Sequence, residues 1–169
     1  MCGYDCAVAQ IFGFPNPVNE KAARTVAAGV VVLSVIAAVS GWWVVLLVLA
    51  AGFAARVATG PTLSPLGQLA TRVVAPRLGA PKLVPGPPKR FAQAIGLAFS
   101  GVALVLNLAG AHSISTAVLI VLAVFATMES ALGLCAGCFL FAQLMRVGLI
   151  SEDTCEACAD IRLRRKVHA

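Results

Sequence analysis

Charged residues are scarce in this sequence of 169 residues, making up only 12% of it, whereas 60% of the residues are hydrophobic. Soluble domains carry about a quarter charged residues, so this composition argues against a soluble fold. Asp, Glu, Lys and Arg are absent from residues 25–55 and again from 91–128. Each stretch exceeds the roughly 20 apolar residues that cross a hydrocarbon core of about 30 Å. The sequence predicts an all-α, multi-pass protein of the inner (plasma) membrane, in contact with lipid.

Several motifs of soluble enzymes are also lacking. The sequence has no phosphate-binding loop, no nucleophile elbow and no paired catalytic carboxylates. Its net charge is +6, but the basic residues lie beside the apolar segments, where membrane orientation and anionic headgroups account for them. A nucleic-acid partner is therefore not expected. Nor is a removable signal peptide, because Asp5, Glu20, Lys21 and Arg24 precede the first apolar run.

The first uncharged stretch is too long for one span, since 31 residues of helix cover about 46 Å. Ser40-Gly41 is the natural break, and the adjacent Trp42-Trp43 are rings typical of a membrane interface. The second stretch divides at residues 110–113. We expect helices near 22–40, 42–58 and 91–110, and a fourth with Ser115 as its N-cap. The result is four transmembrane helices arranged as two hairpins.

The distribution of basic residues predicts the orientation. Both hairpin turns are uncharged, whereas the connection between the hairpins carries basic residues and no acidic one: Arg72, Arg77, Lys82, Lys89 and Arg90. The positive-inside bias places this connection in the cytoplasm, and both termini with it. The single membrane domain, 1–169, then consists of a cytoplasmic N-terminal segment (1–21), hairpin 1 (22–58), a cytoplasmic connection (59–90), hairpin 2 (91–134) and a cytoplasmic, Cys-rich C-terminal region (135–169).

The connection is rich in proline, and its apolar residues recur at near-helical spacing. Ser64 is a candidate cap for a short helix that has Pro65 at its first position. One interpretation is a short amphipathic helix on the cytoplasmic face, held by Arg72 and Arg77 at the headgroups. A plain tethering loop is the alternative, and the sequence leaves both open.

Six cysteines occur as three close pairs: Cys2 and Cys6, Cys135 and Cys138, and Cys155 and Cys158. Cytoplasmic thiols are kept reduced, so structural disulfides are not the first expectation. The two C-x-x-C pairs, sixteen residues apart, have the spacing of a four-thiolate zinc site. Zinc held by Cys135, Cys138, Cys155 and Cys158 is therefore one hypothesis.

Thiol chemistry is the competing hypothesis. A helix break near Gly133 would place Cys135 in the first turn of a new helix, where the helix dipole favours the thiolate. Cys135 is then the attacking thiol and Cys138 the resolving one. Cys155 and Cys158 would form a second pair that exchanges a disulfide or a sulfur atom with the first. Reduced thiols without any function are a third, weaker alternative.

Glu129 is the only acidic residue within the apolar runs, and a carboxylate there requires a partner or a wet cavity. We expect Asn107 and Ser100 as its partners. Direct proton exchange with Cys135 requires the helix break, because a spacing of six residues puts the two on different faces of one helix. A paired carboxylate near the cytoplasmic interface is the alternative to a catalytic one.

Several segments resemble a known family. They are Phe14-Pro15-Asn16-Pro17-Val18-Asn19-Glu20, Leu63-Ser64-Pro65-Leu66-Gly67, Val84-Pro85-Gly86-Pro87-Pro88-Lys89-Arg90-Phe91-Ala92-Gln93, Glu129 through Leu134-Cys135-Ala136-Gly137-Cys138, and Cys155-Glu156-Ala157-Cys158. Together they resemble Domain of Unknown Function family 4395. The resemblance implies an integral membrane protein working beside thioredoxin-like or rhodanese-like sulfur-handling proteins, with no established reaction. Cys2 and Cys6 lie outside the resembling stretch.

Two functions of different class follow. The first is a membrane-embedded thiol–disulfide redox or sulfur-relay partner, with Cys135, Cys138, Cys155, Cys158 and Glu129 as catalytic residues. The second is a non-enzymatic assembly or scaffold subunit whose cytoplasmic end is clasped by zinc.

Overall fold

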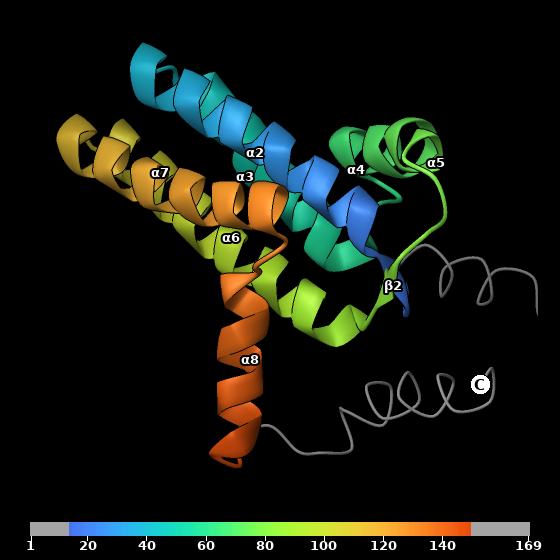
Figure 1. Ribbon diagram of the computed structural model, residues 1–169. Helices are drawn as coiled ribbons and strands as arrows, with labels where there is room; N and C mark the ends of the chain where they lie inside the picture. Colours follow the sequence, from blue (N-terminus) through green and yellow to red (C-terminus); the bar gives the residue numbers. More distant parts are fainter. Residues whose placement is uncertain (1–13, 150–169) are drawn as a thin grey trace, which may run out of the picture.

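The structure, a computed structural model, describes residues 14–149, and these are predominantly helical (Figure 1). The long helices are α2 (Glu20–Ser40), α3 (Trp43–Thr59), α6 (Gly86–Leu108) and α7 (His112–Thr127). A π-helical turn, η2 (Met128–Leu132), continues α7, and α8 (Ala136–Arg146) follows it. Two short strands, β1 (Val18–Asn19) and β2 (Leu83–Val84), pair antiparallel, with Val18 opposite Val84.

The four long helices form a closed bundle. Helix α2 packs against α3 and α7, and α6 packs against the same two helices. The fully buried side chains at the centre include Leu46, Leu49 and Leu119. The Phe53 ring of α3 packs directly on Gly96 of α6, because a Cβ added at Gly96 would lie 2.2 Å from that ring. The apolar residues that do not face this core lie on the outside, as in a bundle whose solvent is lipid.

Three helical segments are long and apolar enough to cross a membrane: Glu20–Ser40, Gly86–Leu108 and His112–Leu132. Trp43–Thr59 is also apolar but has 17 residues, at the lower limit of a span. The all-helical, membrane-type fold predicted from composition is confirmed at this level.

The predicted break after Ser40 is confirmed. Gly41 has φ +64° and donates its N–H to the Ala37 carbonyl at 2.9 Å, which ends α2 with a left-handed residue. The predicted cap of the fourth helix is wrong, since α7 begins at His112 and Ser115 lies inside it. Ser115 is buried and donates a hydrogen bond to the Ala103 carbonyl of α6 at 2.8 Å, so its hydroxyl joins two helices instead of starting one.

The connection contains one continuous helical segment made of α4 (Pro65–Leu69), the π-helical turn η1 (Ala70–Val74) and α5 (Ala75–Arg77). As predicted, Ser64 caps it, because its hydroxyl accepts the Gly67 N–H at 3.2 Å and Pro65 occupies the first position. Leu66 lies against Gly29 of α2, whereas Leu63, Leu69 and Leu78 are exposed.

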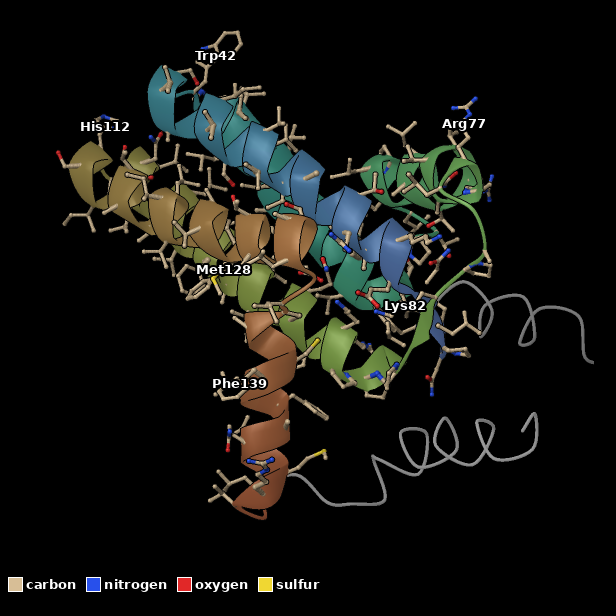
Figure 2. The ribbon with its side chains drawn as sticks, viewed as in Figure 1. Trp42, Arg77, Lys82, His112, Met128 and Phe139 are labelled. Carbon is tan, nitrogen blue, oxygen red and sulfur yellow. The ribbon has the colours of Figure 1, made fainter. Side chains whose placement is uncertain are left out.

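The bundle has two unlike ends (Figure 2). Trp42 and His112 lie at the end that holds the two short interhelical turns, and Arg77 and Lys82 lie toward the other. From near the middle of the bundle α8 departs at a steep angle to the other helices (Figure 1). The residues described next gather where α8 begins.

Candidate functional site

Cys135 is the N-cap of α8, and this position results from the way the preceding helix ends. Gly133 has φ +70°, a conformation that favours glycine, and it ends η2. Arg24 of α2 fixes this end by donating from Nε to the Ser130 carbonyl at 3.0 Å and from Nη2 to the Ala131 carbonyl at 2.7 Å. Two residues later the Cys135 Sγ accepts the Cys138 N–H at 3.4 Å. The helix break predicted near Gly133 is confirmed.

The two thiols of this C-x-x-C pair have opposite electrostatic environments. Hydrogen bonding from the Cys138 thiol, helped by Lys89 and the Cys138 N–H, lowers the pKa of Cys135 from its ordinary value, although burial and Glu129 oppose the change. The same thiol–thiol hydrogen bond, with burial and the neighbouring Cys135 charge, raises the pKa of Cys138. Both cysteines are free and half-buried. Cys135 is thus the more acidic thiol of the pair.

Glu129 forms an ion pair with Lys89 of α6, with Oε1 and Nζ 2.6 Å apart. Their side chains are 13% and 8% exposed, so the pair is nearly desolvated. The predicted partners are wrong. Asn107 donates to the Gly41 carbonyl at the other end of the bundle, and Ser100 donates to carbonyls of its own helix. Asn107 and Ser100 thus bond to backbone carbonyls, whereas Lys89, in the first turn of α6, reaches Glu129.

A cavity of about 300 Å³ lies beside Cys135. Glu129 and Gln93 also line it, and the remaining wall is mainly apolar, including the rings of Phe53, Phe99 and Phe125. We call this the thiol cavity. The break at Gly133 therefore brings Glu129 and Cys135 to one cavity although they are six residues apart, which a continuous helix would not do.

A second cavity, of about 280 Å³, lies between the start of α2, the end of α3 and the start of α6. Arg56, Lys89 and Gln93 line it, and we call it the arginine cavity. Gln93 lines both cavities, and Lys89 of this one pairs with Glu129 of the other. The ion pair therefore lies between the two.

Arg56 and Gln93 are site residues that the sequence pattern did not single out. Arg56 is only 5% exposed, and it donates from Nε to the Gln93 Oε1 at 2.7 Å and from Nη1 to the Ser64 Oγ at 3.2 Å. The available signal was a single guanidinium in the last turn of an otherwise uncharged helix. At an interface such a residue normally extends to water, so its burial was not predictable from that signal.

Within residues 14–149 no three His, Cys, Asp or Glu side chains are grouped so as to hold a metal ion. Cys155 and Cys158, which the zinc hypothesis needs, lie outside the described residues, as do Cys2 and Cys6. The structure thus contains one C-x-x-C half of the hypothetical clasp.

Comparison with known proteins identifies the family. The family described as "Domain of unknown function (DUF4395)" matches residues 18–146, well over half of the chain, and the chain belongs to it. The resemblance noted from the sequence is confirmed. No curated protein and no solved structure matches. Glu129, Cys135 and Cys138 lie within the matched residues, whereas Cys155 and Cys158 lie beyond them.

Proposed function

We propose that this member of the family is a membrane thiol–disulfide or sulfur-relay protein in which Cys135 is the attacking thiol. The observation that carries the proposal is the position of Cys135 as N-cap of α8, with its sulfur bonded to the Cys138 N–H at 3.4 Å. A helix N-terminus favours an anion, and only the thiolate is nucleophilic. The lowered pKa of Cys135 also favours its thiolate.

The exchange needs no acid or base beyond the reacting groups. The Cys135 thiolate attacks one sulfur of a partner disulfide, which breaks the S–S bond and releases the other partner sulfur as a thiolate. That thiolate takes the Cys138 proton, and Cys138 then attacks the Cys135 sulfur. The Cys135–Cys138 disulfide forms, the second partner sulfur leaves as a thiolate, and the partner has gained two electrons. If the donor is a persulfide, Cys135 instead takes its outer sulfur and the donor leaves as a thiolate.

Lys89 and Glu129 are positioning residues in this scheme. The Lys89 charge lowers the pKa of Cys135, and Glu129 holds the ammonium group at 2.6 Å. The apolar thiol cavity shields the sulfur from bulk water on one side. Cys155 and Cys158 are proposed to pass reducing equivalents or sulfur between Cys135 and a cytoplasmic thioredoxin-like or rhodanese-like protein.

The proposed topology is four spans, with α2–α3 and α6–α7 as hairpins and both termini in the cytoplasm. The apolar helices, the exposed Trp42 and Trp43 at one end and the basic connection at the other support it. The capped segment 65–77 is then an interfacial helix with Leu69 and Val73 toward lipid. Labelling of Ser113→Cys and Thr62→Cys in the cysteine-free chain, in intact cells, with a membrane-impermeant maleimide tests this. The proposal expects label at position 113 only.

Trapping tests the thiol function in the full chain. With oxidised glutathione as the probe, Cys138→Ala is expected to hold a glutathione adduct on Cys135, because the resolving thiol is gone. The wild type is expected to release glutathione and to form the Cys135–Cys138 disulfide. Cys135→Ala is the matched variant and is expected to form no adduct at Cys138. An adduct at Cys138 alone, or no reaction at either thiol of the folded protein, contradicts the proposal.

Metal analysis separates this function from the zinc-clasped scaffold. One equivalent of zinc in the purified wild type, lost on Cys155→Ala, would favour the clasp, because each tetrahedral ligand must be a thiolate. The thiol proposal expects no stoichiometric zinc and four titratable thiols among Cys135, Cys138, Cys155 and Cys158 after reduction.

A further inference from the structure

The arginine cavity holds an excess of positive charge. Its lining residues include two cations, Arg56 and Lys89, and no Asp or Glu among those described. Glu129 neutralises Lys89 from the side of the thiol cavity. Arg56 has only neutral acceptors, the amide oxygen of Gln93 and the hydroxyl of Ser64. One positive charge is therefore left without a counter-ion around this cavity, within residues 14–149.

Arg56 also has an unused donor. Its Nη2 is buried and has no hydrogen-bond partner among the described residues. The guanidinium carbon lies 4.5 Å from the centroid of the Phe53 ring, and the residue is in the last turn of α3, where the helix dipole favours a cation. These neutral contacts offset part of the cost of burying the charge, but a donor without an acceptor and a charge without a counter-ion remain costly.

Two carboxamides supply further donors at the same cavity. Asn19 Oδ1 accepts the Lys21 N–H at 3.0 Å, and Gln93 Oε1 accepts from Arg56 Nε at 2.7 Å. Both line the cavity, and since their oxygens are engaged, their NH₂ groups are left as donors for a ligand. A planar guanidinium with amide N–H donors around it is the donor set that binds the oxygens of an oxyanion.

We propose that the arginine cavity binds an oxyanion of the phosphate or sulfate type, with Arg56 as its charge partner and with Asn19 and Gln93 as further donors. Neither Cys135 nor Cys138, the cysteines that the structure describes, lines this cavity, so the site does not depend on the thiol chemistry proposed for them. Its volume of about 280 Å³ accommodates a free oxyanion. In the proposed topology, its place toward the end of the bundle that holds Arg77 and Lys82 would also put it near lipid headgroup phosphates. The shared chemistry is an oxyanion in contact with a buried guanidinium.

Thermal unfolding of the full chain in a neutral detergent measures binding. The melting temperature is followed by tryptophan fluorescence in sodium sulfate or phosphate, with sodium chloride at matched ionic strength as reference. A ligand that binds the folded state raises the melting temperature in a saturable way. The proposal expects this rise with sulfate and phosphate. An equal rise in chloride overturns it.

Two variants locate the site. Arg56→Lys keeps the positive charge but loses the planar guanidinium with its paired N–H donors, and it is expected to weaken sulfate binding at least tenfold. Ala23→Phe leaves Arg56 intact and fills the cavity from α2, because Ala23 lines it, and it is expected to abolish the saturable rise. Ala28→Phe is the matched control on the same helix, at an exposed position outside the lining, and is expected to behave as wild type. Unchanged sulfate binding in Arg56→Lys and Ala23→Phe overturns the proposal.

The source of the anion is distinguished in lipid nanodiscs. If lipid phosphate occupies the site, adding phosphatidylglycerol to phosphatidylcholine discs weakens sulfate binding to the wild type at least tenfold, and it does not weaken the residual binding to Arg56→Lys. If the natural ligand is free, sulfate binding is the same in both discs. A last variant, Asp5→Asn, tests whether a carboxylate of the chain itself fills the site, because Asp5 lies outside the described residues. Tighter sulfate binding in that variant means that the chain supplies its own carboxylate, which overturns an external ligand.

Discussion

Different interactions stabilise the two ends of the bundle. We call the end with Trp42 and His112 the turn end, and the end with Arg77 and Lys82 the charged end. At the turn end, Asn107 contacts the Gly41 carbonyl at 3.3 Å and His112 Nδ1 at 3.2 Å, and neither contact is an ion pair. At the charged end, Lys89–Glu129 and Lys82–Glu20 are ion pairs, and Arg24 and Arg56 donate to neutral acceptors. Buried charge is costly, so a fold keeps it only where the geometry is good or where a function needs it. Both cavities that border this charge lie away from the turn end.

Breaking the buried ion pair gives the largest expected effect. Glu129→Ala leaves Lys89 buried without its partner and is expected to lower the free energy of unfolding by about 3–5 kcal/mol. Lys89→Met with Glu129→Met is expected to restore most of this, because no unpaired charge remains. Unfolding by denaturant in mixed micelles measures both.

The exposed ion pair is the control for that experiment. Lys82 is 69% exposed in its pair with Glu20, so Lys82→Ala is expected to cost at most about 1 kcal/mol. Equal losses of unfolding free energy in Glu129→Ala and Lys82→Ala would show that the buried pair stabilises the fold no more than the exposed pair.

Close packing between α3 and α6 gives the next effect. A Cβ at Gly96 would lie 2.2 Å from the Phe53 ring, and Gly96→Ala is expected to cost about 1–3 kcal/mol through overpacking. Gly101 of the same helix has nothing within 4 Å of an added Cβ, so Gly101→Ala should change the stability by less than about 1 kcal/mol. Melting temperatures of the two variants, compared side by side, check the difference. Equal values would mean that α3 and α6 are not in close contact there.

One substitution made at both ends sharpens the comparison. Gly41 has φ +64° and Gly133 has φ +70°, so alanine at either position is expected to cost about 1–2 kcal/mol. Only Gly133→Ala disturbs the start of α8, where the new Cβ would also lie 3.1 Å from Glu20 Oε1. Cys135 alkylation is therefore expected to change in Gly133→Ala and to stay at the wild-type rate in Gly41→Ala. A changed rate in Gly41→Ala would contradict the separation of the two ends.

The smallest effect is a shift in a pH profile. Alkylation rate follows the thiolate fraction, and the pKa of Cys135 is lowered while that of Cys138 is raised. The Cys135 rate is therefore expected to rise at lower pH than the Cys138 rate. Cys138→Ala removes the donor thiol and moves the Cys135 profile to higher pH. Mass spectrometry of each cysteine after timed alkylation measures this, and an unmoved profile means that Cys138 does not stabilise the thiolate.

Local signals in the sequence predicted three of the helix ends and starts and the position of Cys135. The start of the third long helix was predicted wrongly, because α6 begins at Gly86 and not near residue 91, so Lys89 and Arg90 lie in the helix and not in the connection 59–90. The correct signals were Ser40-Gly41, Ser64-Pro65 and Gly133. Each acts on backbone groups only a few residues away, so its effect can be predicted without knowing the fold. The partner of Glu129 could not be predicted, because Lys89 is 40 residues away and the pairing depends on how α6 packs against α7 and α8, which flank η2. Ser115 was mistaken for a cap since a serine at a helix start and a serine between two helices have the same local pattern.

The partners of the buried charges are synthesised at different times. Lys89 leaves the ribosome 40 residues before Glu129, and Arg24 leaves it 106 residues before the Ser130 carbonyl that it will bind. At roughly 5–20 residues per second, Lys89 waits on the order of 2–8 s for its counter-ion. During that interval the Lys89 ammonium group has no carboxylate partner. The buried pair can therefore form only after α6, α7 and the start of η2 have all been synthesised.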